Sequence, residues 1–119
     1  MAERISILTA SLPADHPVVC SEPVEMRCEY RVFVTNEDIV GCRHYKGDFR
    51  LFPDFTVIDA AIRSYTDAPA GYGIDFAVTS EGETALVEVN DGFSLGCYGL
   101  SPLPYSALLE ARWAQLLGE

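Results

Sequence analysis

Three side chains that could ligate a metal ion through oxygen are close together in this sequence. Asp75 lies in the segment IDFAVT, and Glu88 and Asn90 lie in the segment TALVEVN. Both segments are rich in apolar residues and a polar stretch at 80–83 separates them, so we predict a β-hairpin. Carboxylate and amide oxygens are ligands that suit Mg²⁺.

The register of this hairpin decides whether the three side chains share a face. We assume a two-residue loop at 81–82. One face then carries only apolar pairs: Ile74 with Val89, Phe76 with Val87, and Val78 with Ala85. The opposite face carries Asp75 across from Glu88, and Asn90 across from Gly73.

Two carboxylates directly across from each other on neighbouring strands repel, because their Cβ atoms are about 5 Å apart. A divalent cation held by Asp75, Glu88 and Asn90 would remove this repulsion. Mg²⁺ in such a site keeps positions for water and for phosphate oxygens, which favours nucleotide chemistry. Two simpler interpretations stay open. The carboxylates could be solvated on an exposed face, or the register could slip by one residue.

The rest of the chain predicts an α+β domain with a largely antiparallel sheet of two hairpins and packed helices. Apolar residues alternate from 26 to 34, a turn follows at 35–38, and a second strand runs from 39 to 45. One helix begins after the N-cap Asp54 and stops near Asp67. Its predicted apolar face is listed here: Val57, Ile58, Ala61, Ile62 and Tyr65.

A final helix begins at Ser101 as its cap, with Pro102 in the first turn, and ends at Gly118. Its predicted apolar stripe comprises Leu103, Ala107, Leu108, Ala111, Ala114 and Leu117. We expect one domain over residues 1–119. Residues 1–23 form its lead-in, with a short element before Leu12, and 24–117 form the folded part.

Composition limits the possible partners. The formal net charge is −10, which disfavours nucleic acid and anionic membranes because both are negatively charged. No apolar run approaches the roughly 18 residues of a membrane span, and the first residues do not resemble a secretory signal. We therefore expect a cytoplasmic protein. The four cysteines form no C-x-x-C pair, so we expect thiols rather than a zinc site.

Several segments together resemble the C-terminal lobe of the ATP-grasp ligases, over roughly residues 18–117. Asp75, Glu88 and the Asn90 of LVEVN match the metal-binding pattern of that superfamily. EYRVFV at 29–34 resembles the family strand that carries an arginine near the phosphates. KGDFR at 46–50 is similar to a segment of the ribosomal-protein glutamate ligases. ALVEVNDGFSLGCYG, followed by Arg112-Trp113, resembles a little-characterised branch of the superfamily.

The resemblance implies an ATP-dependent carboxylate–amine ligase that uses Mg²⁺ with ATP. Asp75, Glu88 and Asn90 would hold the metal, with Asn90 also contacting the nucleotide. Arg31 and Arg50 would face the ATP phosphates and act in catalysis. The sequence departs from the glutamate ligases after Arg50, where Leu51-Phe52 replaces small polar residues.

Simpler interpretations of the remaining residues also stay open. Arg31 could be a cross-strand salt-bridge partner, and Arg50 could lie in a solvated loop. Tyr45 is expected to pack at a strand end, and Trp113 to pack in the core.

ATP-grasp enzymes clamp ATP between two lobes, and the sequence matches only one of them. The chain could then be a truncated gene product, an excised domain, or a subunit whose site is completed by a second polypeptide or by a homodimer. The alternative is a catalytically inactive lobe that self-associates or binds a partner.

Overall fold

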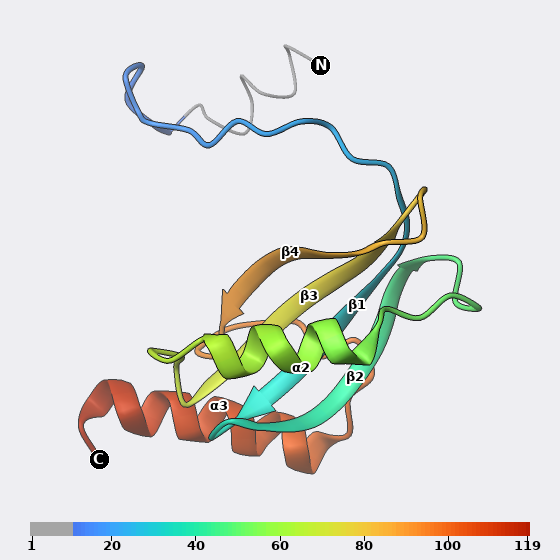
Figure 1. Cartoon of the computed structure of the whole chain (residues 1–119). Coiled ribbons are helices and arrows are strands. Elements are labelled where there is room, and N and C mark those ends of the chain that lie inside the picture. The colour runs from blue at the N-terminus through green and yellow to red at the C-terminus, as the bar shows by residue number, and fades with distance from the viewer. Residues whose placement is uncertain (1–10) are drawn as a thin grey trace.

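A computed structural model of the chain describes residues 11–119 (Figure 1). The elements of this part of the chain, in order, are β1 (Met26–Thr35), β2 (Asp38–Gly47), α2 (Phe55–Ser64), β3 (Gly71–Thr79), β4 (Thr84–Asp91) and α3 (Pro102–Leu117). The strands form one sheet in the order β2-β1-β3-β4, and every neighbouring pair is antiparallel. The predicted α+β class and the two hairpins are confirmed, and the pairing of β1 with β3 joins the hairpins.

Residues 11–25 contain no helix or strand, and they lie away from the sheet until the chain enters β1 (Figure 1). The short element predicted before Leu12 lies largely outside the described residues. Within residues 11–119, neither helix is long and apolar enough to cross a membrane.

The turn between β1 and β2 lies where the sequence predicts it. Asn36 and Glu37 both have positive φ angles, 48° and 71°, and Thr35 pairs with Asp38. This is the geometry of a two-residue hairpin loop whose twist matches that of the strands. Strand β2 continues to Gly47, two residues beyond its predicted end at Tyr45.

The turn between β3 and β4 is one residue longer than predicted. The Thr79 amide donates to the Glu83 carbonyl at 2.8 Å, and Gly82 has a φ of 81°. The longer loop shifts the nearby pairs to Phe76 with Leu86, Ala77 with Ala85, and Val78 with Thr84, so the predicted partners of Phe76 and Val78 are wrong.

An irregularity between Asp75 and Phe76 then restores the predicted register. The extra residue on β4 is Val87, as in a β-bulge. Beyond it, Asp75 pairs with Glu88, Ile74 with Val89, and Gly73 with Asn90, as predicted. The two errors of the predicted register therefore cancel at the candidate site.

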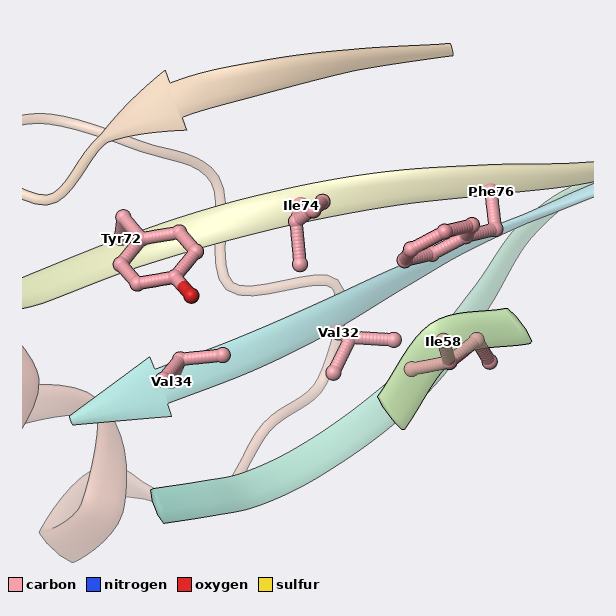
Figure 2. Packing of buried hydrophobic residues seen from close by; sticks show 6 residues of the cluster. All are labelled: Val32, Val34, Ile58, Tyr72, Ile74 and Phe76. Atoms are coloured by element: carbon pink, nitrogen blue, oxygen red, sulfur yellow. The ribbon is translucent and has the colours of Figure 1, made fainter. Parts of the chain in front are cut away.

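Helix α2 covers one face of the sheet through an apolar cluster. The cluster consists of Val32, Val34, Ile58, Tyr72, Ile74 and Phe76, all at most 2% exposed (Figure 2). The carboxylate of Asp54 accepts from the Thr56 amide at 2.9 Å, which confirms the predicted N-cap.

The predicted extent and apolar face of α2 are partly wrong. The helix ends at Ser64 rather than near Asp67. Val57 and Tyr65 are exposed, and Ile58 is the buried residue of the helix. Ala61 and Ile62 pack against the cluster but stay half-buried, because a ten-residue helix covers only part of the sheet.

Helix α3 covers the opposite face of the sheet. Leu108 and Phe33 are both fully buried there, in a cluster with Leu95 and Leu100. Pro102 opens the helix, and Gly118 ends it in a left-handed conformation, as predicted. The predicted stripe is wrong at Ala107, which is exposed, and at Leu103 and Leu117, which are 82% and 64% exposed. At about 100° per residue the two leucine side chains lie about 140° and 180° around the helix from Leu108, so they face solvent.

Leu108→Ala should remove the main contact between α3 and the sheet. We expect it to lower the free energy of unfolding by about 2–5 kcal/mol, because it leaves a cavity in a fully buried cluster. Leu103→Ala, on the exposed side of the same helix, should change it by less than about 0.5 kcal/mol. Urea denaturation measures both, and equal effects would contradict the packing described here.

Candidate functional site

A row of charged side chains crosses the sheet on the face opposite α2. Arg31 on β1 pairs with Asp75 on β3, and Asp75 pairs with Glu88 on β4. Directly opposed residues in neighbouring strands point to the same side of a sheet, so these three side chains form a continuous row. Asp75 is fully buried at its centre, whereas Glu88 is exposed at the sheet edge.

Arg31 and Asp75 form a bidentate ion pair. Arg31 Nε donates to Asp75 Oδ1 at 2.8 Å, and Nη2 donates to Oδ2 at 2.9 Å. Arg31 is 5% exposed, and hydrogen bonding to Asp75 raises the pKa of its guanidinium. The interpretation of Arg31 as a cross-strand salt-bridge partner therefore describes what the structure shows. Its contact with ATP phosphates stays a prediction.

Other groups surround the Arg31 guanidinium. Its Nη1 donates to the Gly96 carbonyl at 3.2 Å, and its Cζ lies 4.8 Å from the centre of the Tyr98 ring, a cation–π distance. Gly73 makes room for this side chain, since a Cβ there would lie 3.1 Å from Arg31 Cδ and 2.7 Å from Leu95 Cδ1. The guanidinium is therefore held on several sides.

Tyr45 joins the aromatic cover to the carboxylates. Its ring stacks on Tyr98 with centroids 4.7 Å apart, and its hydroxyl lies 3.3 Å from both Asp75 Oδ2 and Glu29 Oε1. Burial, together with the charges of Asp75 and Glu29, raises the pKa of Tyr45. The group therefore stays a neutral hydroxyl at physiological pH and can donate its proton to one carboxylate.

Asn90 lies between the two carboxylates. Its Nδ2 is 3.4 Å from Asp75 Oδ2 and 3.4 Å from Glu88 Oε1. Rotation of the amide by half a turn would place Oδ1 there instead, and three oxygens would converge. Neighbouring ligands of an octahedral Mg²⁺ are about 3 Å apart, so this spacing fits a hard cation.

The set of side chains that could ligate a metal ion here is small. In residues 11–119 no group of three His, Cys, Asp or Glu side chains could hold a metal, so a site built on Asp75 and Glu88 would need the Asn90 amide as its third ligand. Both Asp75 oxygens already accept hydrogen bonds from Arg31. The oxygen ligands suit Mg²⁺ in type, and Glu88 and Asn90 are more accessible than Asp75, which would bind a metal only by giving up a hydrogen bond from Arg31.

The structure does not bring Arg50 into this row. Its guanidinium donates to Asp48 at 2.9 and 3.0 Å, and its side chain is 78% exposed. These hydrogen bonds lower the pKa of Asp48 to about 2. Arg50 thus lies on an exposed turn after β2, and its role toward ATP stays a prediction.

The loop at 92–100 lies over the ion pair and is attached to α3 and β2. Tyr105 Oη donates to the Leu95 carbonyl at 2.7 Å, and Arg43 Nε donates to the Tyr98 carbonyl at 3.2 Å. Trp113 Nε1 donates to the Phe93 carbonyl at 3.1 Å. Trp113 is 48% exposed, so the prediction that it packs in the core is wrong; it meets Phe93 edge-on at the surface.

Sequence reasoning missed the roles of Tyr98 and the Gly96 carbonyl at this site. A glycine-rich loop predicts a close approach of backbone but not what it approaches. One signal was available, namely that Arg31 lies between Tyr30 and the apolar run Val32-Phe33-Val34. A buried arginine requires a carboxylate partner, but only the pairing of β1 with β3 identifies it as Asp75.

Comparison with known protein families shows the family of this chain. A family model described as an ATP-grasp domain, family 2 of its clade, matches residues 3–108. Since the match spans most of the sequence, the chain belongs to this ATP-grasp family. The match begins well before residue 18, where the resemblance seen in the sequence starts. No curated protein matches the chain significantly.

Two solved structures share the fold. The ATP-grasp ligase PsnB, solved in complex with a minimal precursor, is 20% identical with a TM-score of 0.54, over 92% of this chain and 41% of its own. The macrocyclase MdnB from Microcystis aeruginosa MRC is 17% identical with a TM-score of 0.54, over 95% of this chain and 44% of its own. This chain therefore spans less than half the length of these two proteins.

Removing one partner of the buried ion pair should lower the free energy of unfolding more than removing both partners. Asp75→Leu leaves the Arg31 charge buried without a carboxylate, so we expect a loss of about 3–5 kcal/mol in unfolding free energy. The double variant Arg31→Met/Asp75→Leu should be closer to wild type. Chemical denaturation of the single and double variants tests this. A double variant less stable than Asp75→Leu would contradict it.

The Asp91–Arg112 pair should make stability depend on pH. Hydrogen bonds from Arg112, at 2.7 and 2.8 Å, lower the pKa of Asp91. A carboxyl with a lowered pKa stabilises the fold above its unfolded pKa, near 4, and the stabilisation is lost as pH falls through the folded value. Asp91→Asn should therefore be less stable than wild type at pH 7, and the difference should shrink below pH 4. A difference that is the same at pH 7 and pH 3 would exclude this linkage.

Proposed function

We propose that this chain forms the metal-binding half of a Mg-ATP site in an ATP-dependent carboxylate–amine ligase. The observation that carries the proposal is the position of the Asn90 amide, 3.4 Å from both Asp75 and Glu88. Membership of an ATP-grasp family supports it. A cytoplasmic setting, which supplies ATP and Mg²⁺, is part of the same proposal.

In a ligase of this kind, ATP phosphorylates a carboxylate, and an amine then displaces the phosphate to form an amide-like bond. The protein contributes mainly positioning and neutralisation of charge. Asp75, Glu88 and Asn90 would hold the Mg²⁺ that neutralises the nucleotide phosphates. Arg31 and Arg50 would offset further phosphate charge. For Arg50, a bound phosphate would have to compete with Asp48 at an exposed position.

The remainder of the ATP clamp would come from a second lobe, on another part of a longer protein, on another polypeptide or on a second copy of this chain. An open apolar groove between α2 and β4 supports an interaction at this edge of the sheet. Its lining includes Ala61, Tyr65, Leu86 and Val89, of which Leu86 is 54% and Val89 40% exposed. The same groove favours the alternative function, an inactive lobe that self-associates or binds a partner.

Calorimetric titration of the purified chain with ATP, with and without Mg²⁺, tests the proposed site. We expect binding that requires Mg²⁺ and is lost in Glu88→Gln, a change at an exposed position that removes one ligand charge. Glu81→Gln, an exposed carboxylate in the turn of the same hairpin, is the matched control and should bind like wild type.

If the affinity for ATP is the same with and without Mg²⁺, and the same in wild type and Glu88→Gln, the proposed metal site is wrong. Absence of binding in wild type would favour the alternative of an inactive lobe.

A further inference from the structure

Asp75 is the centre of the proposed metal site, but its carboxylate already has a cation. We propose that Arg31 is the resident counter-cation of Asp75, kept there by the Tyr98 ring, and that a divalent cation binds Asp75 only as Arg31 releases it. This inference rests on the proposed metal site. It assigns Tyr98 as a positioning residue and makes Arg31 and the metal competitors.

The hydrogen bonds of Asp75 give the first reason. Arg31 donates to both carboxylate oxygens, at 2.8 and 2.9 Å. Oδ2 also accepts from the Tyr45 hydroxyl at 3.3 Å and from the Asn90 amide nitrogen at 3.4 Å. The carboxylate is fully buried, so a metal ion must replace one of these donors rather than fill a vacant position.

Electrostatics decides which donor is the competitor. Tyr45 and Asn90 are neutral, and Asn90 can turn its amide oxygen toward a cation. The guanidinium is positive, and at the same carboxylate it repels a divalent ion in an environment that screens charge poorly. Arg31 is therefore the group whose hold on Asp75 sets the affinity for the metal.

The surroundings of Arg31 show what maintains that hold. Gly96 accepts from Nη1 at 3.2 Å, and the Tyr98 ring lies 4.8 Å from Cζ. Tyr98 itself has a φ of 44°, unusual for a residue with a side chain, and stacks on Tyr45 at 4.7 Å. Because Arg31 is 5% exposed, it can move away from Asp75 only if the 96–98 segment moves.

Competition of this kind is reciprocal. If Arg31 weakens metal binding at Asp75, then metal binding must weaken the hold of Asp75 on Arg31 by the same factor. The released guanidinium would be available to an anionic group at the same face of the sheet. Binding of the cation and exposure of Arg31 would thus be a single coupled event.

Nuclear magnetic resonance of the full chain, with labelled arginine and asparagine side chains, tests the proposal with Mg²⁺ alone as the probe. Metal binding is followed at the Asn90 side-chain amide, with Glu88→Gln as the variant that should abolish it. The hydrogen bond from Arg31 to Asp75 is followed by hydrogen exchange of the Arg31 Nε–H. We expect slow exchange in wild type and acceleration when Mg²⁺ is added.

Three variants distinguish the effect of the Tyr98 ring from a general disturbance of the loop at 92–100. Tyr98→Ala should speed Arg31 Nε–H exchange and raise the affinity for Mg²⁺ about tenfold, as expected for a lost cation–π contact. Tyr98→Phe should match wild type, since no hydrogen bond of the Tyr98 hydroxyl is found within residues 11–119. Phe93→Ala removes a similarly exposed ring of the same loop that packs on Trp113, and should leave both readouts unchanged.

Each remaining outcome overturns the inference. If Mg²⁺ shifts the Asn90 amide in wild type but leaves Arg31 exchange unchanged, the metal site stands and the competition is wrong. The wild-type measurement decides this point even if Tyr98→Ala does not fold. If Mg²⁺ shifts Asn90 in neither wild type nor Tyr98→Ala, both the inference and the proposed metal site are wrong.

Discussion

Two opposite charges lie buried in the middle of this sheet, and much of the surrounding structure keeps them hydrogen-bonded. Burying Arg31 and Asp75 costs desolvation energy that attraction alone need not recover, so their remaining polar groups must also find partners. The Gly96 carbonyl, the Tyr45 hydroxyl and the Asn90 amide supply them. The same contacts fix the loop at 92–100 over the sheet and decide which oxygens remain accessible.

The ion pair also compensates one of two carboxylates that lie side by side on this face of the sheet. The sequence pairs Asp75 with Glu88, which alone would be a repulsive pair. Arg31 neutralises the buried member, while Glu88 at the edge of the sheet is solvated.

The elements of the fold were largely predictable because local rules determine them. The alternation of β1, the N-cap of α2 and the proline and glycine at the ends of α3 each act within a few residues. The packed side of α3 was not predictable from its stripe, because Leu108 fits between Phe33, Leu95 and Leu100, which come from other elements. For the same reason Trp113 was wrongly expected in the core.

By itself the sequence determined the family pattern and the hairpin that carries Asp75 and Glu88, since strand alternation and turn residues need only local information. The pairing of Asp75 with Glu88 also depends on the bulge at Val87. The tertiary structure decided that Val87 bulges, that β1 lies beside β3, and that Arg31 therefore holds Asp75. It also decided that Tyr98 covers that pair while Arg50 stays with Asp48. Apart from the local Arg50–Asp48 pair, these contacts join residues far apart in sequence. Their partners are selected by burial and charge compensation, which no local pattern encodes.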